Sequence, residues 1–237
     1  MSTTIAVIIP TLNEASTIGA TIRHTAGLGF DEIVVVDGGS SDQTGLIVDS
    51  CTSSTRHSAL SPLRLMQAPP GRACQLNAGA RTVRTDVLLF LHADTRLPTD
   101  ARQLIDSVVA DPAVVGGRFD VRFDRASIWS RLIATFMNFR SRLTRISTGD
   151  QAMFVRRHIF ERLSGFSNIP IMEDIEFSRR LKRMGQTVAL HERVVTSFRR
   201  WEQQGPLRTI LLMWVLRFLY WIGVSPHQLH RFYASIR

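Results

Sequence analysis

The sequence predicts an α/β fold with an open, mostly parallel sheet, and three apolar runs in the first half of the chain predict it. Residues 5–9 are rich in β-branched side chains, residues 33–36 repeat this pattern, and residues 87–91 form the third run. Such runs are typical of strands that are buried on both faces of a parallel sheet. Segments with helical spacing lie between the runs, so we expect strands and helices to alternate here.

The segments between the predicted strands have their own signals. Asn13 or Ser16 can cap a first helix over residues 18–28. Gly27 and Gly29 are expected to end this helix. A second helical stretch covers residues 73–83. Residues 50–61 are rich in Ser and Thr, so we expect a surface loop there.

Composition excludes several classes of protein. The 237 residues are 44% hydrophobic, enough to bury one sizeable core, which excludes collagen-like, disordered and disulfide-stapled chains. Cys51 and Cys74 have no CxxC spacing and cannot build a zinc cage, so a reducing, cytosolic environment is expected. The N-terminus has no basic region before its apolar run, so we expect no cleaved signal peptide.

The formal net charge is +9, and Lys182 is the only lysine. Arginine binds phosphate and carboxylate bidentately, so phosphorylated substrates and anionic membrane surfaces are plausible partners. A nucleic-acid partner is not expected, because the sequence has no Cys/His finger, no aromatic RNA-binding strand pattern and no dense basic helix.

The second half of the chain differs in character. From Arg118 onward arginines are spaced among aromatic and aliphatic residues, which predicts helices with one basic face; the arginines are Arg118, Arg122, Arg125, Arg131, Arg140, Arg142 and Arg145. Residues 207–224 are apolar, but their uninterrupted stretches are shorter than the roughly 20 residues of a spanning helix. Their tryptophans and arginines favour a helix lying in the membrane interface, and a core or dimer-interface helix is the alternative.

We therefore expect a main domain over residues 1–204 and a C-terminal apolar and basic helical segment over residues 205–237. The main domain would comprise two halves, residues 1–117 and residues 118–204.

Polar clusters directly follow all three predicted strands, at residues 10–14, 37–42 and 92–94. In open α/β sheets, ligands bind beyond the carboxyl ends of the strands, so these clusters are candidates for one binding site. Each cluster taken alone is equally typical of a turn or a helix cap.

In order and spacing, these clusters resemble glycosyltransferase family 2, whose members have the nucleotide-sugar-binding GT-A fold. The resemblance covers roughly residues 4–200, and it implies that residues 1–117 are the nucleotide-binding half and residues 118–204 the acceptor half. The segments IIPTLNE at residues 8–14 and VVDGGSSDQT at residues 35–44 resemble the family's two nucleoside loops, and GRACQLNAG at residues 71–79 resembles the helix that follows. The resemblance implies that the donor is bound by Pro10, Thr11, Asn13, Glu14, Asp37, Gly39, Arg72, Asn77, Gly79 and Ala93. More narrowly, the sequence resembles a bacterial subgroup described as radical-SAM/selenodomain-associated transferases.

His92-Ala93-Asp94 occupies the place of the family's Asp-x-Asp motif, whose last carboxylate holds a divalent cation against the donor diphosphate. The resemblance implies that Asp94 is a metal ligand. His92 stands where the first acid is usual, and because Mn²⁺ accepts imidazole as well as oxygen ligands, Mn²⁺ or Mg²⁺ remains the expected cofactor. The alternative for His92 is a histidine that packs at the strand end.

Met172-Glu173-Asp174-Ile175-Glu176-Phe177 resembles the family's Glu-Asp motif, which opens a helix. The resemblance makes Asp174 the general base that removes the proton of the attacking hydroxyl in an inverting transfer, with Glu173 on the acceptor side. The alternative is that both acids only favour the positive end of the helix dipole.

Two further segments resemble the acceptor side of the family. Gly149, Asp150 and Gln151 precede a predicted short strand and are candidate acceptor contacts, although a plain β-turn explains the same letters. Arg200 and Trp201 resemble the end of the Gln-x-x-Arg-Trp motif of processive members. Ser197 stands in place of that glutamine, which argues against processive polymer synthesis.

The sequence thus predicts a metal-dependent inverting glycosyltransferase that passes a sugar from a nucleotide-diphosphate sugar to a hydroxyl acceptor, which a lipid can supply. We expect it in the cytoplasm, in peripheral contact with the inner face of the membrane. One alternative is a sugar-phosphate nucleotidyltransferase, although residues 10–20 contain only Gly19 and no basic residue. The other is a non-catalytic, membrane-associated protein that binds nucleotide sugars.

Overall fold

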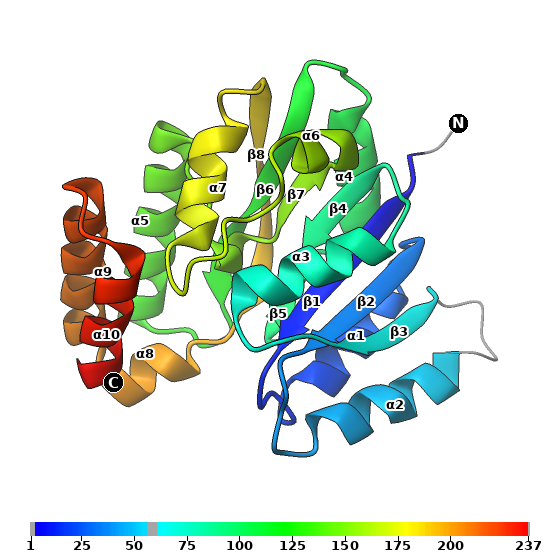
Figure 1. The fold of residues 1–237 in the computed structure, drawn as a ribbon, viewed down its shortest axis with the longest axis horizontal. Coiled ribbons are helices and arrows are strands. Elements are labelled where there is room, and N and C mark those ends of the chain that lie inside the picture. Colours follow the sequence, from blue (N-terminus) through cyan, green and yellow to red (C-terminus); the bar gives the residue numbers. More distant parts are fainter. Residues whose placement is uncertain (1–2, 56–60, 237) are drawn as a thin grey trace.

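The computed structural model of the protein describes residues 3–55 and 61–236. The strands are β1 (Ile5–Thr11), β2 (Glu32–Asp37), β3 (Leu63–Gln67), β4 (Val87–Phe90), β5 (Thr95–Arg96), β6 (Val114–Phe123), β7 (Met153–Arg156) and β8 (Gln186–Thr196). They form one eight-stranded sheet in the order β3-β2-β1-β4-β7-β6-β8-β5, which runs through the middle of the molecule (Figure 1).

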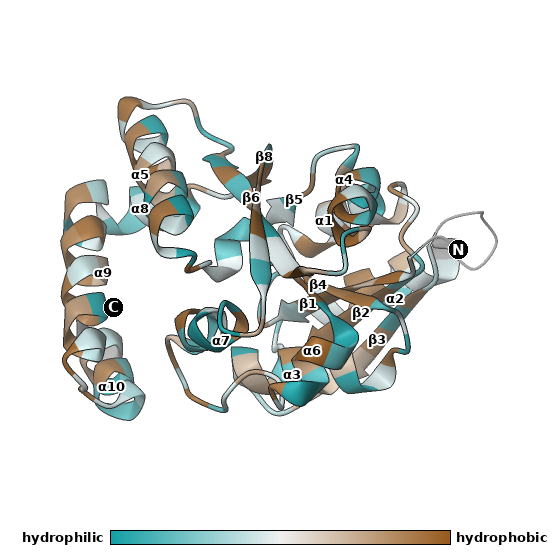
Figure 2. Ribbon diagram, turned by 90° about the horizontal axis from the view of Figure 1, so that it is seen from above, coloured by the Kyte–Doolittle hydropathy of each residue, from teal (hydrophilic) through white to brown (hydrophobic). Residues whose placement is uncertain are grey.

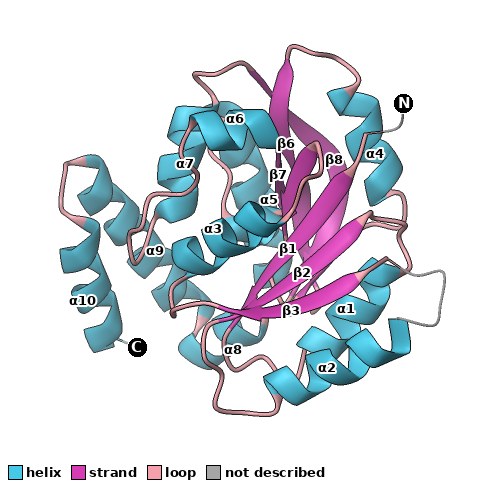
Figure 3. Cartoon of the chain, turned by 45° about the vertical axis from the view of Figure 1, so that its right-hand side comes forward, coloured by secondary structure: helices cyan, strands magenta, loops and turns pink. Residues whose placement is uncertain are grey.

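The helices are α1 (Ile18–Ala26), α2 (Thr44–Thr55), α3 (Arg72–Thr82), α4 (Ala101–Val109), α5 (Ile128–Thr144), η1 (Gly149–Gln151), α6 (Arg157–Arg162), α7 (Glu173–Leu181), α8 (Arg199–Gln204), α9 (Pro206–Trp221) and α10 (Pro226–Ile236). One face of the sheet is covered by α1, α2 and α4, and the other by α3, α6 and α7 (Figure 3). α9 and α10 form an outer layer beyond α5 (Figure 2).

The predicted α/β fold is confirmed. The three predicted strands are β1, β2 and β4, and β1 pairs in parallel with both β2 and β4. The sheet is mixed, because β7 lies antiparallel to both β4 and β6. The two predicted helices are α1 and α3.

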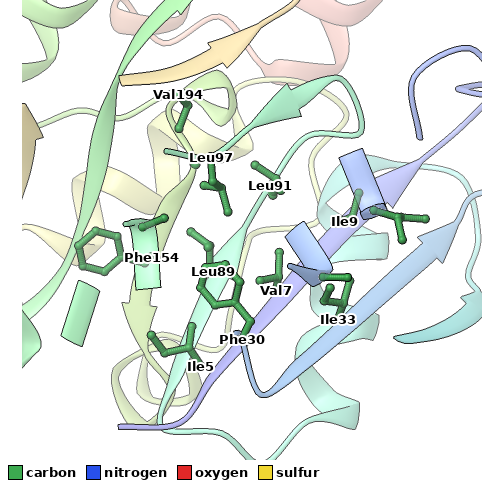
Figure 4. Packing of buried hydrophobic residues seen from close by; sticks show 14 of the residues in the cluster. Ile5, Val7, Ile9, Phe30, Ile33, Leu89, Leu91, Leu97, Phe154 and Val194 are labelled. Atoms are coloured by element: carbon green, nitrogen blue, oxygen red, sulfur yellow. The ribbon is translucent and has the colours of Figure 1, made fainter. Parts of the chain in front are cut away.

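Alternate residues of the central strands point to opposite faces, and both faces are buried, which explains the continuous apolar runs in the sequence. Ile5, Val7 and Ile9 pack with α1, α2 and α4 (Figure 4). Ala6 and Ile8 pack with α3 and α7 on the other face. The sheet is therefore the rigid centre from which the strand-end loops extend.

Three local predictions are wrong. Residues 50–55 are the last turns of α2 and not a surface loop, while residues 56–60 lie outside the described part of the chain. The residue before α1 is Thr17, whose side chain makes no capping hydrogen bond, so neither Asn13 nor Ser16 caps that helix. Arg118 and Arg122 lie on β6 and not on a basic helix.

The second half adds β6, β7 and β8 to the same sheet, so a division at residue 117 falls inside β6. In β6, Gly116 and Gly117 lie against the backbones of β7 and β8, where a Cβ would overlap Phe154 or Val188. Charged, paired side chains on an interior strand masked its strand character in the sequence, since Arg118 is buried and paired with Asp120.

The C-terminal segment folds as α9 and α10. Among the described residues, no helix is long and apolar enough to cross a bilayer, and α9 itself has 16 residues. Leu216, Leu229 and Tyr233 are buried against the part of the chain that precedes and begins α7. The segment is therefore docked on the main domain and is not an extended tail.

Candidate active site

The strand-end clusters lie at one edge of the sheet, as predicted. Thr11 is opposite Asp37 in the β1–β2 register, and its hydroxyl lies 3.4 Å from Oδ1 of Asp37. The backbone N–H of Gly38 donates to the Thr11 carbonyl at 2.9 Å. Leu91, directly before His92, bonds to β1 in the same way, through its N–H and the carbonyl of Ile8.

Asp37 and Asn13 hold the two predicted nucleoside loops together. Asp37 accepts hydrogen bonds from both the backbone N–H and the hydroxyl of Ser40, the latter at 2.5 Å. Asn13 has a left-handed backbone, φ 56°, and its Oδ1 accepts the N–H of Ser41 at 2.9 Å. Because Asn13 tolerates this conformation, the loop can fold back onto its neighbour. Pro10, the last residue but one of β1, is half-buried beneath these loops, and Gly39 also has a positive φ, 89°.

Glu14 connects the first loop to the first residue of α8. Its carboxylate accepts the Thr17 hydroxyl at 2.9 Å and lies 3.5 Å from a guanidinium nitrogen of Arg199. Arg199 also donates to the hydroxyl of Ser16 at 3.1 Å. Arg199 was not predicted from the sequence, since its neighbour Arg200 matched the family motif.

Gln75 is a second residue near the candidate site that was not predicted from the sequence. Its side-chain amide is buried and donates to the carbonyls of Thr11 and Val36, at 2.7 and 2.8 Å. It therefore clamps the ends of β1 and β2 from α3. The signal was present, because a glutamine on the inner face of a helix needs a partner when it is buried.

Asn77 and Gly79, two predicted donor contacts on α3, contact other parts of the protein. Both amide atoms of Asn77 bond to the backbone of Phe166, at 2.8 and 2.9 Å. Gly79 faces the sheet, where a Cβ would lie 2.7 Å from Ile8 and 2.9 Å from Val36. The glycine thus lets α3 approach the sheet closely.

The segment at residues 92–94 is more enclosed than the other clusters. Nδ1 of His92 lies 3.1 Å from a carboxylate oxygen of Asp150, and its Nε2 is buried, without a hydrogen-bond partner, against Gly149. Ala93 is buried and its carbonyl accepts the Thr21 hydroxyl at 2.7 Å. Asp94 is half-buried, and its carboxylate accepts a weak hydrogen bond from the Thr95 hydroxyl at 3.4 Å.

Asp174 is held in place by backbone hydrogen bonds. The N–H of Gly149 donates to its Oδ2 at 2.9 Å, and the N–H of Ile175 to its Oδ1 at 2.7 Å. Met172, before the helix, has a left-handed backbone with φ 69° that turns the chain sharply into α7. Asp174 therefore stands in the first turn, where the helix dipole favours a negative charge.

Glu173 is 4% exposed and pairs with Arg72 of α3, with 3.2 Å between guanidinium nitrogen and carboxylate oxygen. Burial raises the pKa of Glu173, the nearby Asp174 raises it further, and Arg72 opposes both effects. Glu173 is thus an enclosed acid whose ionised form depends on Arg72. The pair ties α3 to α7.

A recess connects several of the predicted residues. Its lining contains Arg72, His92, Gly149, Glu173 and Asp174, together with Leu76, Phe90, Leu91, Met153 and Phe166. The tertiary fold thus brings together residues that are up to 102 positions apart in the sequence, as for Arg72 and Asp174.

The remaining acceptor candidates differ in position. Gln151 is fully buried; its Oε1 accepts the N–H of Thr148 at 3.2 Å, and its Nε2 is buried without a hydrogen-bond partner among the described residues. Trp201 is half-buried between Phe123 and Phe198, with ring centroids 6.1 and 6.4 Å away. The side chain of Arg200 lies outside the described part of the structure.

In the described part of the chain, no three His, Cys, Asp or Glu side chains gather as a metal cluster. Asp94 still fits the cation expected for this fold, since Mg²⁺-type sites often use one or two carboxylates together with substrate phosphates. His92 fits less well, because both of its ring nitrogens are already enclosed by Asp150 and Gly149.

Comparison with known proteins identifies the class to which this fold and site belong. The family model for glycosyl transferase family 2 matches residues 6–164. The chain therefore belongs to glycosyl transferase family 2.

Individual relatives are more distant. A probable glycosyltransferase of Bacillus subtilis, YdaM, is 26% identical, and the match covers 84% of this chain and 50% of YdaM. The chain thus spans about half the length of this curated relative. The solved mannosyltransferase PcManGT from Pyrobaculum calidifontis, in complex with GDP-Man and Mn2+, has a TM-score of 0.66 at 23% identity, covering 83% of this chain and 57% of that chain. S. aureus TarS gives 0.64 at 16% identity, covering 82% and 60%. These two structures support the GT-A fold.

Proposed function

We propose that this protein is a metal-dependent inverting glycosyltransferase with Asp174 as its general base. The observation that supports this most strongly is the anchoring of Asp174 by the N–H of Gly149 at the recess that also contains Arg72. In an inverting transfer, a hydroxyl attacks the anomeric carbon from the face opposite the leaving nucleotide and loses its proton to a base. A positioned carboxylate contributes roughly 10²- to 10⁴-fold to such a step.

The donor is a nucleotide-diphosphate sugar, with the base and ribose bound by the loops around Asn13 and Asp37. Structural neighbours bind donors of this kind: PcManGT was solved with GDP-Man and TarS with UDP-GlcNAc. Asp94 would hold Mn²⁺ or Mg²⁺ against the diphosphate, and the cation would stabilise the charge that develops on the leaving nucleotide. Arg72 lies in the same recess and supplies a guanidinium for phosphate oxygens.

The acceptor hydroxyl belongs to a lipid, and the protein works at the inner face of the membrane. Large apolar side chains are exposed on α9, including Leu211, Trp214, Phe218 and Trp221. The same is true of α5, on which Leu132, Phe136, Phe139 and Leu143 are exposed. The rings of Phe136 and Trp214 are 5.9 Å apart, so the two helices present one apolar surface, the α5–α9 face.

The α5–α9 face is larger than the predicted interfacial segment, because it also includes α5. The sequence predicted helices with one basic face in that region. Large contiguous apolar patches are rare on monomeric soluble proteins and mark interaction surfaces. The formal net charge of +9 favours an anionic bilayer over a neutral protein partner. Residues 205–237 are then a membrane-contacting segment added to the transferase domain, residues 1–204. The proposal includes the narrower resemblance to the radical-SAM/selenodomain-associated transferases.

One observation favours a second function. Because His92 replaces an acid and is engaged with Asp150, the protein could bind nucleotide sugars without turnover. A nucleotide-sugar screen by thermal shift, with and without Mn²⁺, tests the donor, since a ligand at 100 times its Kd adds about 2.7 kcal/mol of stability. Stabilisation that requires Mn²⁺, followed by slow donor hydrolysis, supports the transferase. Binding without any hydrolysis or transfer supports the binding protein, and no stabilisation by any nucleotide sugar contradicts both.

A further inference from the structure

Two arginines near the proposed base have no hydrogen-bond or ion-pair partner among the described residues. Arg140 lies on α5 and Arg217 on α9. In the described part of the chain, neither guanidinium forms a hydrogen bond or an ion pair, and Nε and Nη2 of Arg140 are buried without any partner. Arg72, the other arginine near Asp174, differs because it is paired with Glu173.

Both arginines are in an environment that is unfavourable for a lone cation. Burial lowers the pKa of Arg140 to about 10, the charge of Arg217 lowers it too, and Asp174 acts in the opposite direction. Burial also lowers the pKa of Arg217, against the charges of Asp174 and Asp150. Two half-buried cations repel each other, so an anion that binds both of them stabilises the folded protein. A buried N–H group without a hydrogen-bond partner also costs folding free energy, which such an anion would recover.

The position of the two arginines also indicates the kind of molecule that carries the anion. Arg140 follows Phe136 by four residues and Arg217 follows Trp214 by three, so each guanidinium lies one helical turn from the ring contact that joins the two helices. The pair therefore borders the α5–α9 face on the side of Asp174. An amphiphile with an anionic head and an apolar body would match both features.

We propose that Arg140 and Arg217 bind a phosphate group of the acceptor, beside Asp174. Guanidinium groups hold phosphate through paired N–H donors, and two of them match the charge of a phosphomonoester. This inference rests on the proposed function, because it assigns the acceptor of the same transfer. The phosphate can come from a lipid headgroup or from a soluble phosphorylated acceptor.

The site is tested with inorganic phosphate by thermal shift on the full chain, in the absence of donor. Wild type should be stabilised saturably, and Arg140→Gln and Arg217→Gln should each weaken phosphate affinity at least about tenfold, the smallest change expected for a lost hydrogen bond to a charged group. Arg131→Gln and Arg208→Gln remove exposed arginines from the same helices and should bind phosphate as wild type does. Arg140→Lys keeps the charge and should retain part of the affinity, which separates lost binding from lost folding. No stabilisation of wild type, or equal affinity in all variants, would overturn the proposal.

A second measurement separates acceptor from donor phosphate. With a nucleoside diphosphate and Mn²⁺ at saturation, inorganic phosphate should still stabilise the protein, because the two anions occupy different sites. Loss of the phosphate effect under these conditions would assign the arginines to the donor and overturn the inference, while the proposed transferase function would stand. The absence of nucleotide binding in every variant and in wild type would instead contradict the proposed function.

The source of the phosphate is determined with vesicles. Wild type should bind vesicles of phosphatidylcholine with phosphatidic acid more tightly than vesicles of equal charge made with phosphatidylserine, since only the former has a phosphomonoester headgroup. Arg140→Gln and Arg217→Gln should lose this preference, and Arg131→Gln should keep it. Phosphate binding without any lipid preference supports the site with a soluble phosphorylated acceptor.

Discussion

The backbone N–H of Gly149 donates to Oδ2 of Asp174 at 2.9 Å, and Gly149 at the same time lies against Nε2 of His92. One residue of η1 thus contacts both the proposed base and the histidine of the proposed metal-binding segment. A third contact completes the arrangement, because Asp150 is paired with Nδ1 of His92 at 3.1 Å. The geometry of the base and of the strand-end segment is therefore coupled through two consecutive residues.

Asp174→Asn should lower kcat for transfer at least about a hundredfold, the low end of general-base contributions, with little change in donor affinity. The amide keeps the size of the side chain but cannot accept the proton of the acceptor. The measurement is steady-state transfer together with donor Kd. Asp49→Asn, on the exposed surface of α2, is the matched control and should leave kcat unchanged.

Near-normal transfer by Asp174→Asn, combined with loss of transfer in Glu173→Gln or Glu176→Gln, would assign the base to another carboxylate. Retention of the donor's anomeric configuration would exclude a single inverting displacement.

Asp94→Ala should abolish Mn²⁺-dependent nucleotide binding and leave the fold intact, because Asp94 is half-buried at a strand end and does not fill the core. Calorimetric titration with a nucleoside diphosphate, with and without Mn²⁺, measures this. His92→Ala should weaken metal affinity less, since its ring nitrogens face Asp150 and Gly149. An equal loss in both variants would make His92 a full ligand, and unchanged metal dependence in Asp94→Ala would refute the assignment.

Gly149→Ala should reduce transfer more than it reduces stability. The new methyl group would overlap Nε2 of His92, so either the ring or η1 must shift, and a shift of η1 displaces the N–H that holds Asp174. Overpacking of this kind typically costs about 1–3 kcal/mol. Gly45→Ala is a suitable control, because a Cβ there meets nothing within 4 Å. Equal kcat values for the two variants would show that the Gly149 contact does not position the base.

Glu173→Gln should change the pH dependence of stability. The pKa of Glu173 is raised in the folded state by burial and by Asp174, so the folded protein binds a proton more tightly there than the unfolded chain does. Folding stability from this group therefore falls as pH rises from the unfolded pKa through the higher folded pKa. The Tm of the variant relative to wild type should rise across this window toward neutral pH and be constant below it. A relative Tm that falls with rising pH would mean that the Arg72 pair outweighs burial.

Substitution of Trp214 and Phe136 by serine should weaken binding to anionic vesicles by at least about tenfold, because burying each large apolar side chain is worth about 1.5–3 kcal/mol. Co-sedimentation with vesicles measures the change, and donor hydrolysis should be unaffected. Leu46→Ser, at an exposed apolar position on α2, is the control. If vesicle binding is unchanged but a dimer dissociates, the α5–α9 face is a subunit interface. Deletion from residue 207 onward should act in the same direction, with activity on a lipid acceptor reduced more than donor hydrolysis.

Much of the fold was predictable from local sequence. The runs in β1, β2 and β4 are continuous and apolar because both of their faces are buried, so their pattern needs no knowledge of partners. β6 was not predictable in this way. Its buried Arg118 is compensated by Asp120, and only the paired structure makes that charge acceptable in the interior.

Only part of the candidate site followed from the sequence. Asp37 and Asp94 at strand ends, and Asp174 in the first turn of α7, could be nominated because their motifs are short and have a fixed order. Asn77, Gly79 and Gln151 occur in the same motifs, but their side chains or Cα atoms face the interior, which no motif reveals. Gln75 and Arg199 were missed because their partners come from other loops.

The sequence by itself determined the alternation of buried strands and helices and the edge of the sheet at which ligands meet, because side-chain periodicity and strand-end chemistry are local properties. The tertiary structure decided which charges are paired. Arg72 acquires Glu173 from a helix 101 residues away, whereas Arg140 and Arg217 have no ion-pair partner within residues 3–55 and 61–236. Pairing depends on distances between elements that are remote in the chain, and burial then sets the free energy of each charge. The same composition of arginines therefore yields a structural ion pair in one place and a proposed phosphate site in another.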